Sequence, residues 1–324
     1  MEYRSLGRTG MQVSPLCLGC LNFGHVTHES ESVEIINFAI NEGINFFDTA
    51  NVYTRGQSEE IIGKALKQNR KRDKIILATK VHGKMANDDP NAQGNSRRHI
   101  LQQCEASLTR LQTDYIDLYQ IHRPSRDVPL DETLRALDDL IKAGKVLYIG
   151  TSTFAAWQLV GSLWISKELN LNRFVCEQPP YNLLERRIEN ELIPMALTFG
   201  MAIIPWSPLA GGFLTGKYKR NQIRPKGSRY DRQDNSWCGR LFSDASFDIL
   251  EGVKKISEEK DCTVSQLALA WCAQQPGITS PIIGPRTLQQ LKDNLGSLNV
   301  EITKQDLEKI DSLAAPGMAT VQHI

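Results

Sequence analysis

A run of apolar residues in the stretch INFFDTANVY, residues 44–53, stops at an aspartate, and a tyrosine follows five positions later. Taken alone, Asp48 is typical of a helix N-cap and Tyr53 of a surface tyrosine. Two other apolar runs also end in a titratable residue: Lys80 follows IILAT, and His122 follows YIDLYQI. Each residue has an ordinary structural explanation, but four such groups at equivalent places indicate one shared site.

The four side chains together could deliver a proton to a carbonyl oxygen. A phenol has a pKa of about 10, which is too high for efficient proton transfer near neutral pH. We expect the ammonium of Lys80 to lower the pKa of Tyr53 by favouring the phenolate, and Asp48 to hold Lys80 in place and protonated. His122 could then hydrogen-bond a substrate oxygen. This chemistry predicts Tyr53 as the proton donor.

Eight short β-prone runs alternate with amphipathic helical patterns along the chain. The expected strands span residues 13–19, 44–47, 74–80, 115–122, 146–152, 173–178, 201–207 and 280–284. The expected helices, in which apolar residues recur three and four apart, span residues 33–40, 59–66, 100–111, 134–141, 157–165, 188–197 and 264–272. Strands that are apolar on both faces and separated by helices imply a parallel sheet. Eight such repeats predict an α/β fold, a closed (β/α)8 TIM barrel.

Boundary residues agree with this fold. Thr263 and Gln266 form a capping box ahead of the helical pattern at residues 264–272. A Gly-containing turn between two β-prone pieces predicts an N-terminal β-hairpin within residues 3–13, before the first barrel strand. No Pro- or Ser-rich linker divides the chain, so we expect one domain spanning residues 1–324. In such a barrel the active site gathers at the C-terminal ends of the strands.

Two long segments, residues 82–96 and 212–243, are expected at the rim of the pocket. The second fits no helix or strand pattern, and a long irregular segment in a compact chain is more often a functional loop than a linker. Their sequences do not define their conformations, so the shape of the substrate pocket stays open.

The charge composition excludes several classes of partner. The 324 residues include 38 Lys and Arg against 37 Asp and Glu, which gives no global electrostatic reason to bind nucleic acid or an anionic membrane surface. The first residues lack the apolar core of a signal peptide, and no stretch approaches the roughly 20 apolar residues of a membrane span. We therefore expect a soluble, cytoplasmic protein that binds a small molecule.

Seven cysteines, an odd number, are scattered through strand-like and helix-like segments, which favours reduced thiols over a disulfide framework. Cys17 and Cys20 form a CxxC motif, with His25 and His28 close behind, so a metal or redox site has to be weighed. No second CxxC or matching histidine pair completes four ligands, and PLCLGC is typical of a buried strand. We expect no bound metal.

Six stretches of the chain are highly specific as a set: LGRTGMQVSPLCLG, FFDTANVYTRGQSEEIIGKAL, LTRLQTDYIDLYQIHRP, LIKAGKVLYIGTST, EQPPYNLLERRIENELIP and PWSPLAGGFLTGKY. With them the sequence resembles the aldo-keto reductase superfamily over essentially its whole length, and most of all the branch of potassium-channel β-subunits and related bacterial reductases. The resemblance implies a TIM barrel and hydride transfer from NADPH to an aldehyde or ketone. It also implies a catalytic tetrad formed by Asp48, Tyr53, Lys80 and His122.

The resemblance further implies which residues contact NADP(H). Ser152 and Gln178 match positions that bind the carboxamide, and Trp206 matches the aromatic residue that stacks on the nicotinamide. Cys20 and Leu21 match positions near the nicotinamide ribose. The remaining implied contacts are Gly19 and Asp48, the pyrophosphate loop of Ser207, Pro208, Leu209, Ala210, Gly211, Lys217 and Arg229, and the phosphate-binding turn and helix of Gly284, Arg286, Gln290, Asp293 and Asn294.

The phosphate site is expected at the start of a helix. No GxGxxG motif is present, whereas IIGPRTLQQLKDNL places a Gly-containing turn before a helix that begins near Thr287. Two positions depart from the family pattern. Thr153 stands where an asparagine is frequent, which weakens a carboxamide contact, and Gln290 stands where many members have the arginine that grips the 2′-phosphate. Arg286 could replace that arginine, so we expect a preference for NADPH.

Two alternative functions are compatible with a barrel of this kind. The first is a regulatory subunit that binds NADP(H) as a redox signal and acts through a protein partner, but the presence of both Tyr53 and His122 favours the enzyme. The second is a metal-dependent barrel hydrolase, which would need clustered His and Asp ligands at the strand ends, and the sequence lacks them. The sequence does not name the carbonyl substrate, and it leaves the oligomeric state open, including a homo-oligomer.

Overall fold

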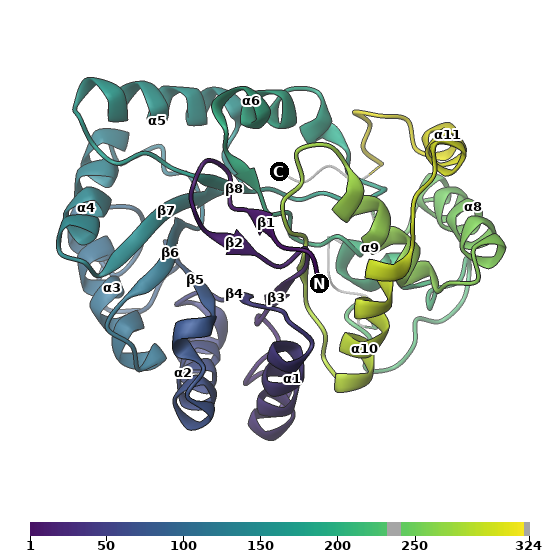
Figure 1. Cartoon of the computed structure of the whole chain (residues 1–324), viewed down its shortest axis with the longest axis horizontal. Helices are drawn as coiled ribbons and strands as arrows, with labels where there is room; N and C mark the ends of the chain where they lie inside the picture. The colour runs from purple at the N-terminus through teal and green to yellow at the C-terminus, as the bar shows by residue number, and fades with distance from the viewer. Residues whose placement is uncertain (232–240, 321–324) are drawn as a thin grey trace.

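A computed structural model, which describes residues 1–231 and 241–320, has eight parallel strands at its centre (Figure 1). They lie in the order β10-β3-β4-β5-β6-β7-β8-β9. Their bounds are β3 Cys17–Gly19, β4 Phe46–Asp48, β5 Ile76–Val81, β6 Ile116–Ile121, β7 Val146–Ser152, β8 Cys176–Gln178, β9 Ala202–Ile203 and β10 Ile282–Ile283. The two edge strands are joined because the backbone N–H groups of Thr279 and Ile282 donate to the carbonyls of Ile203 and Pro205 at 2.8 Å. The predicted (β/α)8 fold and its eight strands are confirmed.

Helices surround the sheet, and every expected helix overlaps an observed one. The helices are α1 Glu29–Asn41, α2 Gln57–Asn69, α3 Arg97–Leu111, α4 Leu130–Lys142, α5 Ala156–Glu168, α6 Leu192–Phe199, α8 Asp244–Glu259, α9 Val264–Gln274, α10 Leu288–Gly296 and α11 Lys304–Leu313. Short 3-10 turns cover Tyr53–Gly56, Arg72–Lys74, Arg187–Glu189, Ala210–Thr215 and Ser297–Asn299. Among the described residues, no helix is both long enough and apolar enough to cross a membrane.

The capping box predicted at the start of α9 is confirmed. Thr263 Oγ1 accepts from the Gln266 backbone N–H, and Gln266 Oε1 accepts from the Thr263 backbone N–H, both at 3.1 Å. Helices α8 and α11 were not predicted, although Ser243 and Thr303 cap their first turns with side-chain hydroxyls as N-cap residues do. The two unpredicted helices contact each other.

Side chains inside the barrel change from apolar to polar along the strands. Residues two apart on a strand share a face. Near the start of their strands, the inward-facing side chains form one apolar cluster that includes Phe46, Ala78, Leu118 and Cys176. Two residues further along the same four strands come Asp48, Lys80, Gln120 and Gln178, all of them buried. The C-terminal end of the barrel therefore holds a buried polar layer.

The N-terminal hairpin closes the opposite end of the barrel. Its strands, β1 Arg4–Ser5 and β2 Gln12–Val13, are antiparallel as predicted, and Figure 1 shows them across the centre of the ring of helices. Leu6 and Val13 are fully buried in the apolar interior cluster. Gly7 has φ 57°, and a Cβ there would lie 2.7 Å from the Ala202 backbone nitrogen. Only glycine fits at this close approach. Because the hairpin covers this end of the barrel, ligands can enter only from the opposite, polar end.

The segment expected to be irregular, residues 212–243, is only partly so. It begins inside the 3-10 turn Ala210–Thr215, has no helix or strand from residue 216 to residue 231, and then includes residues 232–240, which lie outside the described part. Four aromatic rings hold its two described ends together, with centroids 5.1–6.2 Å apart: Phe213, Tyr218, Tyr230 and Phe242.

Candidate active site

Lys80, on β5, is the centre of the predicted catalytic group. Its ammonium donates to Asp48 Oδ2 at 2.5 Å, to the Thr49 carbonyl at 2.8 Å and to the Tyr53 hydroxyl at 3.2 Å. Strands β4 and β5 are paired neighbours, so the ends that carry Asp48 and Lys80 lie side by side. The 3-10 turn after β4 carries the phenol of Tyr53 back over these ends. The structure thus brings Lys80 to Asp48 and Tyr53, which precede it by 32 and 27 residues.

His122 follows directly after β6 and completes the group. Its ring centroid lies 5.7 Å from that of Tyr53, with the two ring planes at 80°. Its backbone N–H donates to the Val81 carbonyl at 3.0 Å, which fixes it beside β5. Burial, and then the charge of Lys80, lower the pKa of His122 to about 2. The imidazole is therefore neutral around pH 7 and can donate only one N–H.

Two amide side chains complete the surroundings of Asp48. Its Oδ1 accepts from Gln120 Nε2 at 3.0 Å and from Gln178 Nε2 at 2.9 Å. Together with Lys80 on Oδ2, these donors satisfy both carboxylate oxygens of a residue that is 3% exposed. A fully hydrogen-bonded buried carboxylate is held in one orientation. Asp48 therefore positions Lys80, as predicted from the residue types.

Lys80 acts on the pKa of Tyr53 in the expected, lowering direction, but the net pKa of Tyr53 is raised. Burial raises the pKa of Tyr53, and the opposing effect of the Lys80 charge is smaller. Burial also disfavours the ammonium of Lys80, but attraction to Asp48 and Tyr53 outweighs it and raises the pKa of Lys80. The group therefore holds a neutral phenol beside a protonated lysine, which is the protonation state of a proton donor.

A cavity of about 890 Å³ extends from Tyr53 and His122 to the start of α10. All but one of the residues expected to contact the cofactor line it: Gly19, Cys20, Leu21, Asp48, Ser152, Gln178, Trp206, Ser207, Pro208, Leu209, Gly211, Lys217, Arg229, Gly284, Arg286, Gln290, Asp293 and Asn294. The exception is Ala210, whose side chain is buried below the lining. Lys80 also lies behind the cavity wall, covered by Asp48 and Tyr53.

The end of the cavity near α10 is rich in cations. Lys217, Lys226, Arg229 and Arg286 line it together with two acids, Glu31 and Asp293. Desolvation in the cleft, and then the neighbouring charge of Arg286, lower the pKa of Lys217. Crowded positive charges beside a helix N-terminus suit an anion such as a phosphate. Helix α10 begins where it was predicted, with Thr287 as its N-cap.

Arg286 links two sides of the cavity. Its Nη1 donates to the Gly227 carbonyl at 3.0 Å, so the guanidinium reaches from the turn before α10 to the irregular segment after Thr215. The turn itself is fixed from the other side, because Thr27 Oγ1 donates to the Arg286 carbonyl at 3.0 Å and Asn22 Nδ2 donates to the Gly284 carbonyl at 2.9 Å. Residues from three distant parts of the chain therefore close over this end.

Two of the side chains predicted to contact the cofactor make hydrogen bonds within the protein. Gln290 Oε1 accepts from the Arg286 backbone N–H at 2.8 Å and so holds the turn before α10. Asp293 Oδ1 accepts from Thr263 Oγ1 at 3.1 Å and from Gln266 Nε2 at 3.2 Å, which ties α10 to the start of α9. Both side chains shape the cation-rich end of the cavity in addition to lining it.

At the end of β7 the chain adopts a strained turn. Ser152 Oγ donates to the Gln178 carbonyl at 2.9 Å, and Thr153 follows with φ 64°, a left-handed conformation that is unfavourable for a β-branched residue. Arg123 Nη1 donates to Thr153 Oγ1 at 2.6 Å and stands 6.0 Å from the ring centre of Trp206. The turn thus carries Ser152 to the cavity beside Gln178.

Sequence reasoning missed several residues of this site. Gln120 could have been found, because it lies two residues before His122 on a strand and therefore faces the same way. Arg123, directly after His122, was an equally accessible candidate. The cavity-lining residues Asn22, Lys226 and Gly227 carried no such signal, because their positions depend on how distant loops meet.

The CxxC cysteines are part of the packed interior. Cys17 and Cys20 are buried free thiols, and burial raises the pKa of both well above the ordinary value. In the part of the chain that the structure describes, no group of three or more His, Cys, Asp or Glu side chains could hold a metal ion. Cys20 lines the cavity, whereas Cys17 lies in the apolar layer below it.

Known proteins resemble this chain over its whole length. The sequence pattern of the aldo/keto reductase family matches residues 15–315. The uncharacterized oxidoreductase YrpG of Bacillus subtilis is 40% identical over 329 residues, which cover 99% of this chain and 98% of the relative. Versiconal hemiacetal acetate reductase of Aspergillus parasiticus is 35% identical over 345 residues, 98% of each chain. A probable voltage-gated potassium channel subunit beta of Arabidopsis thaliana is 36% identical over 319 residues, 97% of this chain and 96% of the relative.

Proposed function

This chain belongs to the aldo/keto reductase family, and we propose that it reduces an aldehyde or ketone with NADPH, using Tyr53 as the proton donor. The observation that carries the proposal is one continuous cavity with two chemically different ends. At one end, Tyr53 is hydrogen-bonded to the buried Lys80–Asp48 pair, and at the other, four cations gather beside the start of α10. Such a cavity suits a hydride donor with an anionic tail.

The residues present fit a nicotinamide dinucleotide phosphate. The volume of about 890 Å³ lies in the usual range of cofactor sites. Trp206, Gln178 and Ser152 would hold the nicotinamide, while Lys217, Arg229 and the turn before α10 would hold the phosphates. Arg286 would favour the 2′-phosphate through charge-assisted hydrogen bonds. Once bound there, the cofactor supplies the hydride.

The side chains of this protein would manage the proton and the orientation of the substrate. The Tyr53 hydroxyl donates its proton to the carbonyl oxygen of the substrate. The ammonium of Lys80, 3.2 Å away, then stabilises the phenolate that remains. Asp48 keeps Lys80 charged and in place, and the neutral His122 donates an N–H to the same carbonyl oxygen. Both donors act on the oxygen where negative charge develops during hydride transfer.

A redox-sensing regulatory subunit is the second candidate function, because the relatives include a protein whose name describes a potassium channel β-subunit. The same cavity would serve NADP(H) binding in that role. Tyr53 and His122 favour the enzyme, because binding a redox signal needs neither a proton donor nor a carbonyl-orienting group. Under this second function, the cofactor would bind tightly and carbonyl compounds would be reduced slowly or not at all.

Steady-state NADPH oxidation, measured against a panel of aldehydes, ketones, sugars and quinones, tests the proposal. We expect at least one class to be reduced with a kcat of about 1 per second or more, typical of enzymes. The Tyr53→Phe variant should lose this activity with every active substrate. NADPH binding without reduction of any member of the panel would instead support the regulatory function.

A further inference from the structure

The outer face of α5 carries an exposed aromatic stripe. Trp157 and Trp164 are 71% and 70% exposed, and Val160, between them, is 39% exposed. Trp157 and Trp164 are seven residues apart and therefore lie on the same face of the helix. The opposite face is buried, with Ala156, Leu159, Ser162 and Ser166 packed inward. Figure 1 shows α5 in the outer ring of helices.

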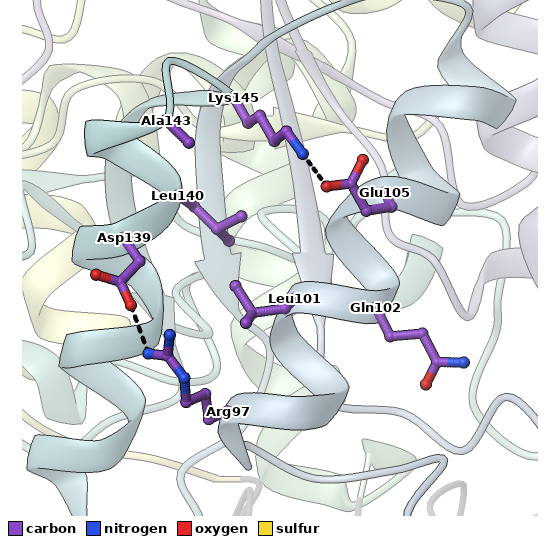
Figure 2. Close-up of a pocket in the computed structure, with 8 residues that line it drawn as sticks. All are labelled: Arg97, Leu101, Gln102, Glu105, Asp139, Leu140, Ala143 and Lys145. Atoms are coloured by element: carbon purple, nitrogen blue, oxygen red, sulfur yellow. Dashed lines mark hydrogen bonds and ion pairs between the residues drawn. The ribbon is translucent and has the colours of Figure 1, made fainter.

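The central three turns of α5 carry no charge between the two tryptophans. Residues 156–166, AWQLVGSLWIS, contain no Asp, Glu, Lys or Arg. The groove between α3 and α4, about 410 Å³ in volume, shows the contrast (Figure 2). There Arg97 pairs with Asp139 at 2.5 Å and Lys145 pairs with Glu105, so the exposed charges satisfy one another. An apolar helix face without such charges is typical of an interaction site.

We propose that α5 is an interface through which two copies of this chain pair about a twofold axis, with Trp157 of one copy packed against Trp164 of the second. The stripe is nearly symmetric about Val160 and Gly161, so an antiparallel pair of α5 helices presents matching positions to each other. Gly161 has open space where a Cβ would point, which lets the two helices approach closely at the axis.

The charges at the helix ends favour the antiparallel arrangement. Glu168, at the C-terminal end of α5, accepts a hydrogen bond from Trp164 Nε1 at 3.2 Å and so lies on the same stripe. In the antiparallel pair this carboxylate lies near the N-terminal end of the other α5, where the helix dipole favours a negative charge. The central three turns of α5 contain no charged residue, so pairing of the two helices buries no charge there.

The area of the stripe is consistent with its being the centre of an interface. Given the size of a tryptophan side chain, the exposed parts of Trp157 and Trp164 amount to roughly 300 Å² per copy. For two copies this is roughly 600 Å², about half of the ~1,200 Å² at which stable interfaces begin. Tryptophans commonly provide most of the binding energy at the centre of an interface, and the neighbouring neutral residues of α5 would supply further area.

Sedimentation velocity of the full-length protein tests this proposal without reference to its catalytic activity. We expect wild-type protein to be dimeric, or a larger even assembly, at micromolar concentration. The double variant Trp157→Glu with Trp164→Glu should raise the dissociation constant of the pair at least a hundredfold, with its thermal midpoint within a few degrees of wild type. Leu197→Glu, which places the same charge at a site on α6 that is 59% exposed, is the matched control and should stay associated.

Crosslinking provides a second measurement should the double variant fold poorly. Gly161→Cys places one thiol per copy next to the proposed axis, and a short bismaleimide should join the two copies well above the wild-type background. Lys304→Cys, on α11 and 92% exposed, should not be joined. A monomeric wild-type protein at 100 µM, an unchanged assembly in the double variant, or equal crosslinking of both cysteines would overturn the proposal. The proposal would also be overturned if the wild type were monomeric and the double variant lost only its binding to a different protein.

Discussion

The two ends of the cavity are built from different parts of the fold. At the end proposed for proton transfer, the side chains on strands β4, β5 and β8 are buried and hydrogen-bonded inside the barrel, whereas His122 after β6 and Tyr53 on the turn after β4 are half-buried. The end proposed to hold the nucleotide is formed by loops that meet only in space, as in the contact between Arg286 and Gly227. Under the proposed function, the barrel strands would fix the geometry of the chemistry, whereas loop contacts would set the choice of cofactor. Substitutions at one end should therefore change mainly kcat, and substitutions at the other end should change mainly the affinity for the cofactor.

The largest expected effect is at the proton-transfer end. Tyr53→Phe removes the hydroxyl that lies 3.2 Å from Lys80 Nζ and should lower kcat by roughly a hundredfold to ten-thousandfold, the usual contribution of a positioned general acid. The dissociation constant of NADPH, measured by fluorescence quenching, should change by less than about threefold. Tyr3→Phe, which removes a half-exposed hydroxyl bonded to the Gly43 carbonyl, is the control. Near-normal turnover by Tyr53→Phe would remove this residue as the proton donor.

At the nucleotide end, Arg286→Ala should act on binding and discriminate between cofactors. An arginine that reaches a 2′-phosphate contributes roughly 1.5–3 kcal/mol, so NADPH should bind about ten- to a hundredfold more weakly while NADH binding is nearly unchanged. Titration calorimetry with both cofactors measures the difference. The control is Arg135→Ala, on α4 and outside the cavity lining.

Equal losses for both cofactors would show that Arg286 acts through its hydrogen bond to Gly227 and not through the 2′-phosphate. Arg286→Lys separates the two effects further. A lysine keeps one positive charge but cannot make two parallel hydrogen bonds to a phosphate, so the preference for NADPH should fall between those of wild type and the alanine variant.

A third test concerns Glu177 on β8, a buried acid in addition to Asp48 on β4. Asp48 is paired with Lys80, whereas Glu177 is fully buried and accepts hydrogen bonds from neutral groups, among them the Thr151 hydroxyl at 2.5 Å and the Phe154 backbone N–H at 3.0 Å. Burial raises the pKa of Glu177 from 4.5 to about 8. Between these pH values the unfolded chain ionises this group and the folded chain does not. Glu177 therefore makes the protein less stable as the pH rises through this window.

Glu177→Gln should remove this dependence. The difference in the free energy of unfolding between pH 5 and pH 8 should change by roughly 1–3 kcal/mol in favour of the variant at pH 8, as measured by urea denaturation. Glu177→Ala leaves the Thr151 and Phe154 donors without their acceptor, so it should destabilise the protein at both pH values. An identical pH dependence for wild type and the glutamine variant would contradict the neutral buried state of Glu177.

The smallest effect is expected where the two ends meet, at the turn after β7. Thr153 has φ 64°, and asparagine tolerates this conformation better than a β-branched residue while keeping an acceptor for Arg123. Thr153→Asn should raise the free energy of unfolding by about 0.5–1 kcal/mol. Thr109→Asn, on the exposed surface of α3, should give no gain. A loss of stability in Thr153→Asn would show that the threonine methyl contributes more by packing than the turn costs.

Local patterns in the sequence determined the barrel and the proposed catalytic group. Alternation in strands and three-to-four spacing in helices depend on neighbouring residues, so eight strands and the positions of Asp48, Lys80 and His122 at their ends were predictable. Gln120 was predictable by the same rule and was overlooked. The resemblance to a known family added the cofactor positions, and of these only Ala210 does not line the cavity.

Tertiary structure alone decided the features that depend on burial and on contacts between distant segments. The net direction of the Tyr53 pKa shift was mispredicted because the sequence reveals the nearby charge but not the extent of burial, and here burial has the larger effect. The hydrogen bond from Arg286 to the Gly227 carbonyl joins residues that are 59 positions apart, in loops without a regular sequence pattern. Trp157 and Trp164 lie within the helix expected at residues 157–165, and only the packing of α5 against the barrel shows that both point outward. Each of these features depends on contacts between residues that are far apart in the sequence, and local sequence periodicity does not encode such contacts.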